Sequence, residues 1–194
     1  MLGVALAFAV HLINASALAE FSSAVSSVNG QPDLELRARQ GLLDDSLVER
    51  VSAHPGVALA SPVLEVPVQV LVPEGQPLGV KLLGVDALVV AGLSPALMPV
   101  TDERRDEPDA RRFDLFAPDA VFLNAAAQQA LAGQTQVRLQ GGATLRVAGR
   151  VNAPGAPLMV MDVAALQDLT NRVGQLSRID LRLTPGVRAP DELA

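Results

Sequence analysis

The chain has 194 residues, enough for one large domain or two small ones, and its formal charge of −6, its 3% of aromatic residues and its single lysine, Lys81, exclude a nucleic-acid-binding surface. It has no cysteine, so disulfides, zinc–thiolate sites and iron–sulfur clusters are excluded as well. The two histidines, His11 and His54, are too few for a histidine metal cluster and leave little basis for Ser-His-Asp chemistry.

The first 28 residues predict a long helix whose character changes along its length. Leu2–Ile13 is apolar on every side except at His11, as in a helix buried in lipid or in a large core. From Leu18 to Val28 apolar residues recur every three or four positions among Ser and Glu, which is typical of a water-exposed helix that packs along one stripe. We interpret this segment as the end of a membrane span that continues into a stalk.

Two alternatives stay open for this segment. It is an ordinary core helix if its twelve or so apolar residues are too few, since a span needs about 20. It is a secretory signal if Ala15-Ser16-Ala17 is a cleavage site, although the positively charged start of such a signal is missing.

One face of the same helix carries His11, Asn14 and Leu18 at spacings of three and four. Polar groups at membrane depth usually face other protein segments rather than lipid. We therefore predict that these three residues contact another helix. The alternative is a buried His11 that is bonded to a backbone carbonyl.

A strand–helix–strand unit follows. Residues 34–38 alternate between apolar and charged, which predicts a half-buried strand, and Asp44 or Asp45 is expected to cap a short helix that Pro55-Gly56 ends. Val57–Val72 is rich in Val and Leu and predicts a longer strand.

Two prolines interrupt this longer strand, Pro62 and Pro67. Because proline cannot donate to a central ladder, we expect the strand to be broken, bulged or at a sheet edge. Leu78–Val85 then returns as its partner. Residues 87–118 are less regular and could hold a short helix or lid, and we interpret the charged stretch Thr101–Arg112 as a solvated loop rather than a contact patch.

A strand, an N-cap and a helix occur in this order twice in the rest of the chain. The first set is Val121–Leu123, Asn124 and residues 125–132, followed by a hairpin over residues 137–147. The second set is Leu158–Met161, Asp162 and Val163–Arg172, followed by a strand at residues 179–183. Residues 190–194 look like the first turn of another helix.

No set of side chains in the sequence predicts catalysis, a cofactor site or a metal site. The paired acids at Asp44-Asp45 and Asp102-Glu103 are adjacent, so their side chains point apart. Asp86 and Asp162 follow apolar strands, but turn and N-cap roles explain them. We therefore expect a protein that is not an enzyme.

Four passages resemble the extracytoplasmic core domain of MacB/FtsX-type ABC transporter permeases. They are GVALAFAVHLINASALAEF, VALASPVLEVPVQV with LLGVD, DAVFLNAAAQQALAG with LRVAGRV, and PLMVMDVAALQDLTNRVGQLSRIDLRLTPG. The last passage is the most specific, because strand, cap, Ala/Gln helix, glycine and strand follow in the order of the family. Residues 87–118 match least.

The resemblance implies an α+β fold with a long N-terminal stalk helix. Residues 1–29 would be the end of the first membrane span and the stalk. Residues 30–86 and 151–194 would form a βαβ-rich, porter-like subdomain built from both chain ends. Residues 87–150 would form an inserted, mostly-β, sabre-like subdomain.

The resemblance also implies a function without catalysis. The domain would lie on the periplasmic or extracellular side of a bacterial inner membrane and transmit ATPase-driven motion of the membrane helices to cargo or partner proteins, in export, efflux or lipoprotein release. The implied partners are a cytosolic ABC ATPase subunit, a second permease subunit in a dimer, and a periplasmic partner or a lipoprotein or lipophilic cargo. The alternative is a passive periplasmic module that binds a ligand or a protein.

Overall fold

The computed structural model describes residues 31–72, 76–101 and 114–187. The predicted stalk helix, the helix-contact residues His11, Asn14 and Leu18, most of the charged loop 101–112 and the helix start at residues 190–194 lie outside the described residues. The described residues are mixed α and β, rich in strands and with short helices, which confirms the α+β class.

The elements follow one another in an order close to the one expected. They are β1 Leu34–Leu36, β2 Leu43–Asp44, α2 Leu47–Ser52, β3 Val57–Leu71, β4 Leu78–Val85, α3 Val90–Leu93, the 3₁₀ turn η1 Pro95–Leu97, β5 Val100–Thr101, the 3₁₀ turn η2 Asp114–Phe116, β6 Ala120–Leu123, α5 Ala125–Ala130, β7 Gln136–Leu139, β8 Thr144–Arg150, β9 Leu158–Asp162, α6 Val163–Leu169, β10 Gln175–Leu176 and β11 Arg178–Leu183.

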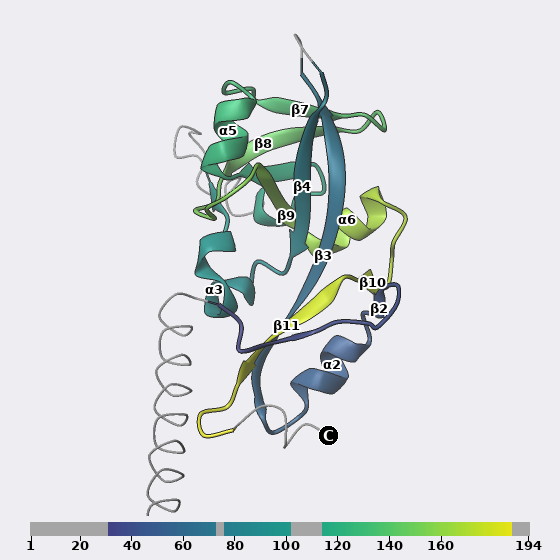
Figure 1. The fold of residues 1–194 in the computed structure, drawn as a ribbon, viewed down its shortest axis with the longest axis vertical. Helices are drawn as coiled ribbons and strands as arrows, with labels where there is room; N and C mark the ends of the chain where they lie inside the picture. The colour runs from purple at the N-terminus through teal and green to yellow at the C-terminus, as the bar shows by residue number, and fades with distance from the viewer. Residues whose placement is uncertain (1–30, 73–75, 102–113, 188–194) are drawn as a thin grey trace, which may run out of the picture.

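Nine strands form one sheet, in the order β1-β11-β3-β4-β9-β6-β8-β5, and β7 pairs with both β8 and β3. These two pairings close the strands β3, β4, β9, β6, β8 and β7 into a ring, which is a small barrel. The barrel occupies the upper half of the molecule in Figure 1. We call the remaining lower half, made of β1, β2, α2, β10, β11 and the start of β3, the base.

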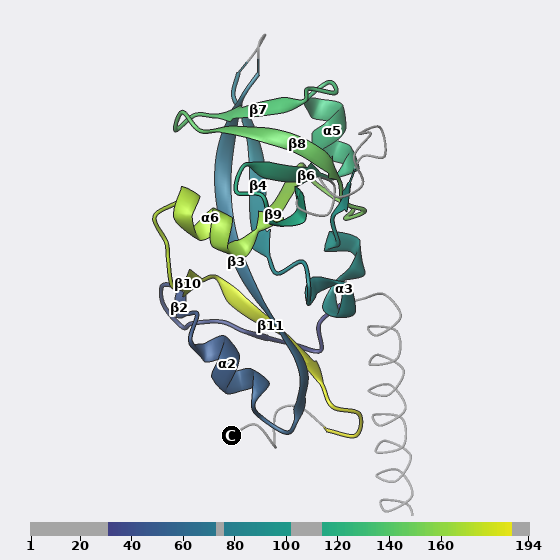
Figure 2. The same cartoon turned by 180° about the vertical axis from the view of Figure 1, so that it is seen from behind.

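The barrel interior is filled by one apolar cluster to which all six ring strands contribute. On β3 it takes the alternate residues Leu64, Val66 and Val70, as the period of two in the sequence predicts. Helix α5 adds Ala127, its C-cap residue Leu131 follows, and α6 adds Leu166 to the same cluster. Figure 2 shows α5 beside β7 and β8, and α6 at the height of β9, below β7 and β8. A second cluster covers the outer face of β4, β6 and β9 under α3 and the two 3₁₀ turns.

Helix α6 lies very close to β4. A Cβ atom built on Gly84 would lie 2.9 Å from Val163 Cα and 3.1 Å from the Leu166 side chain. Glycine is therefore required here by the close approach of helix and strand, and not by its backbone conformation.

The base has its own apolar core on one face of β1, β11 and the start of β3. Buried Leu43, Val57, Leu176 and Ile179 pack there against the apolar face of α2. The opposite face of the same strands carries the charged side chains described below.

Two local predictions are corrected by the structure. The N-cap residue of α2 is Ser46, not Asp44 or Asp45, and Asp44 Oδ1 instead accepts the Ser46 amide at 2.9 Å, because Asp44 belongs to β2. Helix α6 ends at Leu169 rather than Arg172, because Asn171 (φ +53°) adopts a left-handed conformation before Gly174.

Strand β3 is continuous over 15 residues and lies inside the sheet, in spite of its two prolines. The Glu65 amide faces the β11 side, where it meets Ser177, and backbone groups alternate in direction along a strand. The Pro67 nitrogen therefore also faces the β11 side, where the last residue paired with β11 is Val63. The Pro62 nitrogen faces the β4 side, where pairing with β4 begins only at Val63. Each proline thus sits at a local edge, as the sequence predicts.

The division into residues 30–86 with 151–194 and residues 87–150 stays a prediction. The described sheet is continuous through both sets of residues, and the barrel takes strands from each of them.

Candidate functional site

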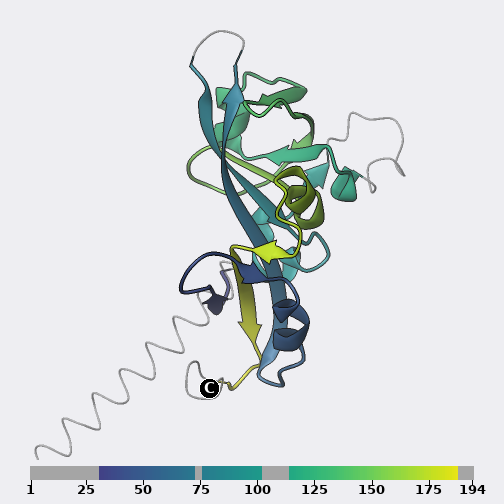
Figure 3. The ribbon, with the colours of Figure 1, turned by 90° about the vertical axis from the view of Figure 1, so that its right-hand side faces the viewer.

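The candidate functional site is the connection between base and barrel. Strand β11 pairs with β3 from Val57 to Val63, and β4 pairs with the other side of β3 from Val63 to Val70. Val63 is therefore the one residue of β3 that both strands pair. We call the stretch Val63–Glu65 the joint. Figure 3 shows β3 (blue) running from the base into the barrel.

Ser177 extends the pairing on the β11 side past Val63. Its amide donates to the Val63 carbonyl at 2.9 Å. Its hydroxyl accepts the Glu65 amide at 2.9 Å and donates to the Glu65 carbonyl at 3.3 Å. A serine side chain thus replaces a strand neighbour for the last residue of the joint.

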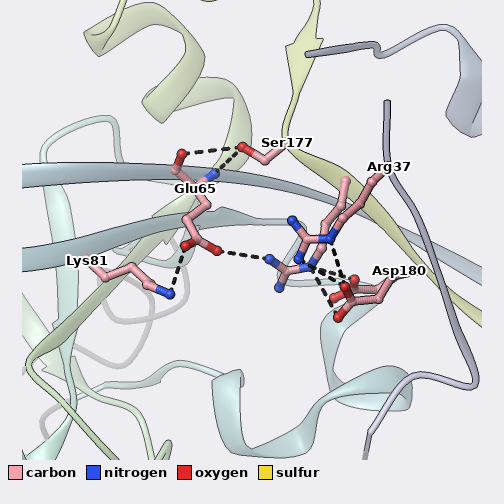
Figure 4. A network of polar contacts seen from close by, with 7 residues as sticks. Arg37, Glu65, Lys81, Ser177 and Asp180 are labelled. Carbon is pink, nitrogen blue, oxygen red and sulfur yellow. Dashed lines mark hydrogen bonds and ion pairs between the residues drawn. The ribbon is translucent and has the colours of Figure 1, made fainter. Parts of the chain in front are cut away.

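Charged side chains form a chain of contacts over the joint (Figure 4). Arg178, at the start of β11, donates through Nε to Asp180 Oδ1 at 2.7 Å and through Nη1 to Glu65 Oε2 at 3.1 Å. Lys81 Nζ on β4 lies 2.7 Å from Glu65 Oε1. On β1, Glu35 lies 3.8 Å from Arg178 Nε and 2.9 Å from Arg37. The contacts therefore join four neighbouring strands.

Burial and mutual charge set the protonation of this cluster. Burial would lower the pKa of Arg178, which is 9% exposed, but the hydrogen bond and charge of Asp180, with the charges of Glu35 and Glu65, raise that pKa above its usual value. Partial burial would raise the pKa of Glu65, but Lys81 and Arg178 outweigh it and lower that pKa. Burial raises the pKa of Asp180 in spite of its contact with Arg178. The two cations therefore favour an ionised Glu65.

A cleft of about 420 Å³ opens beside these charges. Glu65, Lys81 and Arg178 form its polar floor, and Leu97 of η1 and the loop 153–158 form its walls. A second concavity, of about 590 Å³, lies between β5, β8 and the end of α5, where apolar Leu123 and polar groups such as Arg150 line it together.

Asn124 holds the loop that walls the cleft. Its side chain is 1% exposed, and its Oδ1 accepts the amides of Ala127 at 2.9 Å and Leu158 at 3.0 Å. Its Nδ2 donates to the carbonyls of Ala153 at 3.2 Å and Ala156 at 2.9 Å. The predicted N-cap role of Asn124 is confirmed, and the structure adds the role of fixing the loop.

Arg182 connects the first described residue to α3. Its Nη2 donates to the Gln31 carbonyl at 3.3 Å and to the Leu93 carbonyl at 3.2 Å, and its Nε lies 3.8 Å from Asp33 Oδ2. The incoming end of the described chain, β11 and α3 therefore meet at one side chain.

The acidic residues singled out in the sequence have local structural roles. Asp162 caps α6 by accepting the amides of Ala164 and Ala165, and Asp86 Oδ1 accepts the Leu88 amide at 2.8 Å in a turn, so both predictions are confirmed. Asp45 Oδ2 lies 3.4 Å from Gln167 Nε2.

The charges at the joint are not among the predicted site residues. A signal for them was present, because Glu65, Arg178 and Asp180 stand inside strands that are otherwise apolar. Alternation along each strand predicts that these side chains face solvent, whereas the folded chain buries two of them.

Two further properties concern only the residues that the structure describes. No group of three or more potential metal-ligating side chains comes together among residues 31–72, 76–101 and 114–187. Within the same ranges, no helix is both long and apolar enough to cross a membrane.

This fold is that of the extracytoplasmic domains of ABC transporter permeases. The structure is similar to the extracellular domain of YknZ, a noncanonic ABC-type transporter from Gram-positive bacteria, with a TM-score of 0.57 and 11% identity over 79% of this chain and 82% of that chain. It is also similar to the periplasmic region of MacB from Actinobacillus actinomycetemcomitans, with a TM-score of 0.57 and 13% identity over 79% of this chain and 71% of that one.

A third similar structure is a domain assigned to a permease protein from Porphyromonas gingivalis, with a TM-score of 0.51 and 14% identity over 77% of this chain and 72% of that one. The sequence matches no family model and no curated protein. At these identities the likeness is one of fold, and it agrees with the resemblance seen in the sequence.

Proposed function

We propose that this chain is the extracytoplasmic domain of an ABC transporter permease, on the outer side of a bacterial inner membrane. Its role would be to transmit ATPase-driven motion of the membrane helices to periplasmic cargo or to partner proteins. The observation that carries the proposal is the fold. The similarity to the YknZ and MacB domains covers 79% of this chain in each case.

The geometry of the base supports a mechanical role. The Asp33 amide donates to the Leu181 carbonyl at 2.8 Å, and the Leu183 amide donates to Asp33 Oδ2 at 2.9 Å, so the incoming and outgoing ends of the described chain are bonded to each other. A displacement applied at either end would therefore act on β1 and β11 together. From these strands it would reach the barrel through β3.

A mechanical role needs no reactive side chain in this domain. Glu65 is bound by two cations at the joint, and Asp180 is bound by Arg178, so each already has a charged partner. We propose that a separate cytosolic ATPase subunit hydrolyses ATP and that a second permease subunit completes a dimer. The cargo would belong to export, efflux or lipoprotein release.

The alternative is a passive binding module, and the concavity of about 590 Å³ between β5, β8 and α5 is the feature that favours it. A ligand held at this site by the purified protein, with binding that does not change when an ATPase subunit is present and active, would support the alternative.

The absence of cysteine makes the side of the membrane testable. Gln140→Cys places one thiol in the exposed turn between β7 and β8, and Ala127→Cys places one in the barrel core as a matched control. In cells with an intact inner membrane, an impermeant maleimide should label the first variant and not the second. Labelling of Gln140→Cys only after lysis would contradict the proposed location.

The partner is tested separately. An ATPase subunit should be retained when the intact permease is purified from the membrane in detergent. Purification without any ATPase, from cells in which the first experiment succeeds, would contradict the transporter role and leave a surface-exposed binding module.

A further inference from the structure

We propose that Glu65, Lys81, Ser177 and Arg178, which we call the clasp, stiffen the joint so that the base and the barrel move as one body. This inference rests on the proposed function for its purpose, but the stiffness itself is a property of the isolated chain.

The backbone connection at the joint is narrow. Residues 57–62 of β3 pair only with β11, and β4 pairs the other side only from Val63 onward. A sheet resists bending when strands are hydrogen-bonded on both sides, and here this holds for one residue. Pro67 keeps the exposed edge open beyond the joint, because it has no amide to offer to a further strand.

On one face of β3, apolar packing through α6 connects the core of the base with the core of the barrel. Val163 of α6 packs against both the barrel core and the core of the base. Gln167 of the same helix donates to the Gln175 carbonyl at 3.1 Å, which ties α6 to β10. Cross-strand neighbours share a face, so Arg178 lies on the Val63 and Glu65 face of β3, opposite the barrel-core residues Leu64 and Val66. On this face the second apolar cluster covers Val63 but takes no residue from β1, β10 or β11, so polar contacts, those of the clasp among them, join base and barrel there.

The bonds of Ser177 and Arg178 to Glu65 cross the joint, and Lys81 holds the same carboxylate from the barrel side. Ser177 lies between β10 and β11 of the base, and Arg178 begins β11. Glu65 is the last residue of the joint, and Lys81 is on a barrel strand. Glu65 is bonded through its amide and carbonyl to Ser177, and through its two carboxylate oxygens to Arg178 and Lys81. Three contacts of Glu65 thus lead to the base, and one leads to a barrel strand.

The chemistry of these bonds suits a stiff connection. Hydrogen bonds between charged groups are shorter and stronger than neutral ones, and they are stronger again when water is partly excluded. Arg178 is largely buried, so its bond to Glu65 is screened less than a surface ion pair would be.

The test measures the distance between base and barrel directly. Glu49→Cys on α2 and Gln140→Cys in the β7–β8 turn are exposed, and they are unique labelling sites in this cysteine-free chain. Spin labels on the full 194-residue chain, read by pulsed electron double resonance, should give one narrow distance distribution. The substitution Arg178→Met should broaden it or add a second, displaced population.

Arg146→Met is the matched control. Arg146 is also partly buried and also ion-paired, at 2.8 Å from Asp114, but this pair lies within the barrel half and does not cross the joint. It should leave the distribution unchanged. An unchanged distribution in Arg178→Met, or equal broadening in both variants, would overturn the clasp.

Two further variants keep the test decisive if Arg178→Met does not fold. Lys81→Met changes a residue whose side chain is 54% exposed, and it should broaden the distribution without unfolding the chain. Ser177→Ala should make hydrogen exchange of the Glu65 amide about tenfold faster, which equals about 1.4 kcal/mol. If the first leaves the distances unchanged and the second leaves the exchange rate unchanged, the clasp is contradicted.

The outcomes separate this inference from the proposed function. The distances are measured without membrane, ATPase or cargo, so a broadened distribution in Arg178→Met supports the clasp whatever the cell-labelling experiment gives. Correct labelling in cells together with unchanged distances would support the function and contradict the clasp.

Discussion

Replacing Asn124 tests whether this N-cap residue also stabilises the loop 153–158. Asn124→Ala removes two acceptor contacts, to the amides of Ala127 and Leu158, and two donor contacts, to the carbonyls of Ala153 and Ala156. Asp162→Ala removes only the two acceptor contacts of an N-cap in the corresponding place before α6. The two variants therefore differ by the contacts to the loop that walls the cleft.

The expected difference follows from these contacts. Loss of an N-cap costs about 1 kcal/mol, which is the whole effect expected for Asp162→Ala. A buried group that is left without a partner costs about 1–3 kcal/mol. The Leu158 amide and the Ala153 carbonyl are both in buried residues, whereas Ala156 is exposed and water can replace its contact. We therefore expect Asn124→Ala to lower the free energy of unfolding by about 3–7 kcal/mol.

Urea unfolding followed by circular dichroism measures the free energy of unfolding of both variants. For a native domain this free energy is about 5–15 kcal/mol. Asn124→Asp adds a check, because it keeps the acceptor oxygen for the cap and loses both donated bonds. It should be less stable than the parent, because the carboxylate would face the carbonyls of Ala153 and Ala156 without a donor. If Asn124→Ala costs no more than Asp162→Ala, the loop contacts contribute nothing and the reasoning is wrong.

Two more predictions concern the packing of α6 and the charge at the joint. Gly84→Ala should destabilise the chain by about 1–3 kcal/mol in urea unfolding, because the new Cβ would lie 2.9 Å from Val163 Cα, whereas Gly79→Ala, whose Cβ would meet only the end of a side chain at 3.6 Å, should be near neutral. Glu65→Gln should be less stable than the parent at pH 7, and the gap should shrink as the pH falls below about 4.5. The pKa of Glu65 is lowered by folding, so its contribution is lost on protonation. A gap that grows on acidification in thermal unfolding would show the opposite sign.

Local signals in the sequence predict most of the elements. Asn124 and Asp162 each follow an apolar strand and precede an Ala- and Gln-containing helix, and both caps are where the sequence places them. The Gly141–Gly142 hairpin is equally local. Such features depend on neighbouring residues only, so one sequence is enough to locate them.

Contacts between distant residues could not be predicted in this way. The barrel is closed by two pairs between β7 and β3, Val70 with Leu139 and Leu71 with Arg138, which are about 70 positions apart in the chain. Strands β2 and β10 have two residues each, too few to show a period. Short elements and long-range pairings carry no periodic signal of their own.

The charged joint was missed for a related reason. Arg178 and Asp180 alternate with Ile179 and Leu181, and this pattern predicts a strand with one face in water. The strand is as predicted, but Asp180 is 3% exposed, because other parts of the fold cover the face that was expected to be exposed to solvent. Whether a polar face meets solvent depends on the tertiary arrangement, which alternation does not encode.

The connectivity explains why a polar clasp is placed at this joint. The chain passes from base to barrel along β3 and returns to the base after α6, through β10 to β11. The outgoing and returning segments meet where Ser177 and Arg178 contact Glu65, which is 112 and 113 positions away in the chain. Directional hydrogen bonds between charged groups fix one register of these two segments. A barrel displaced against its base must therefore break these bonds first, which makes Arg178 the residue whose loss changes the motion most.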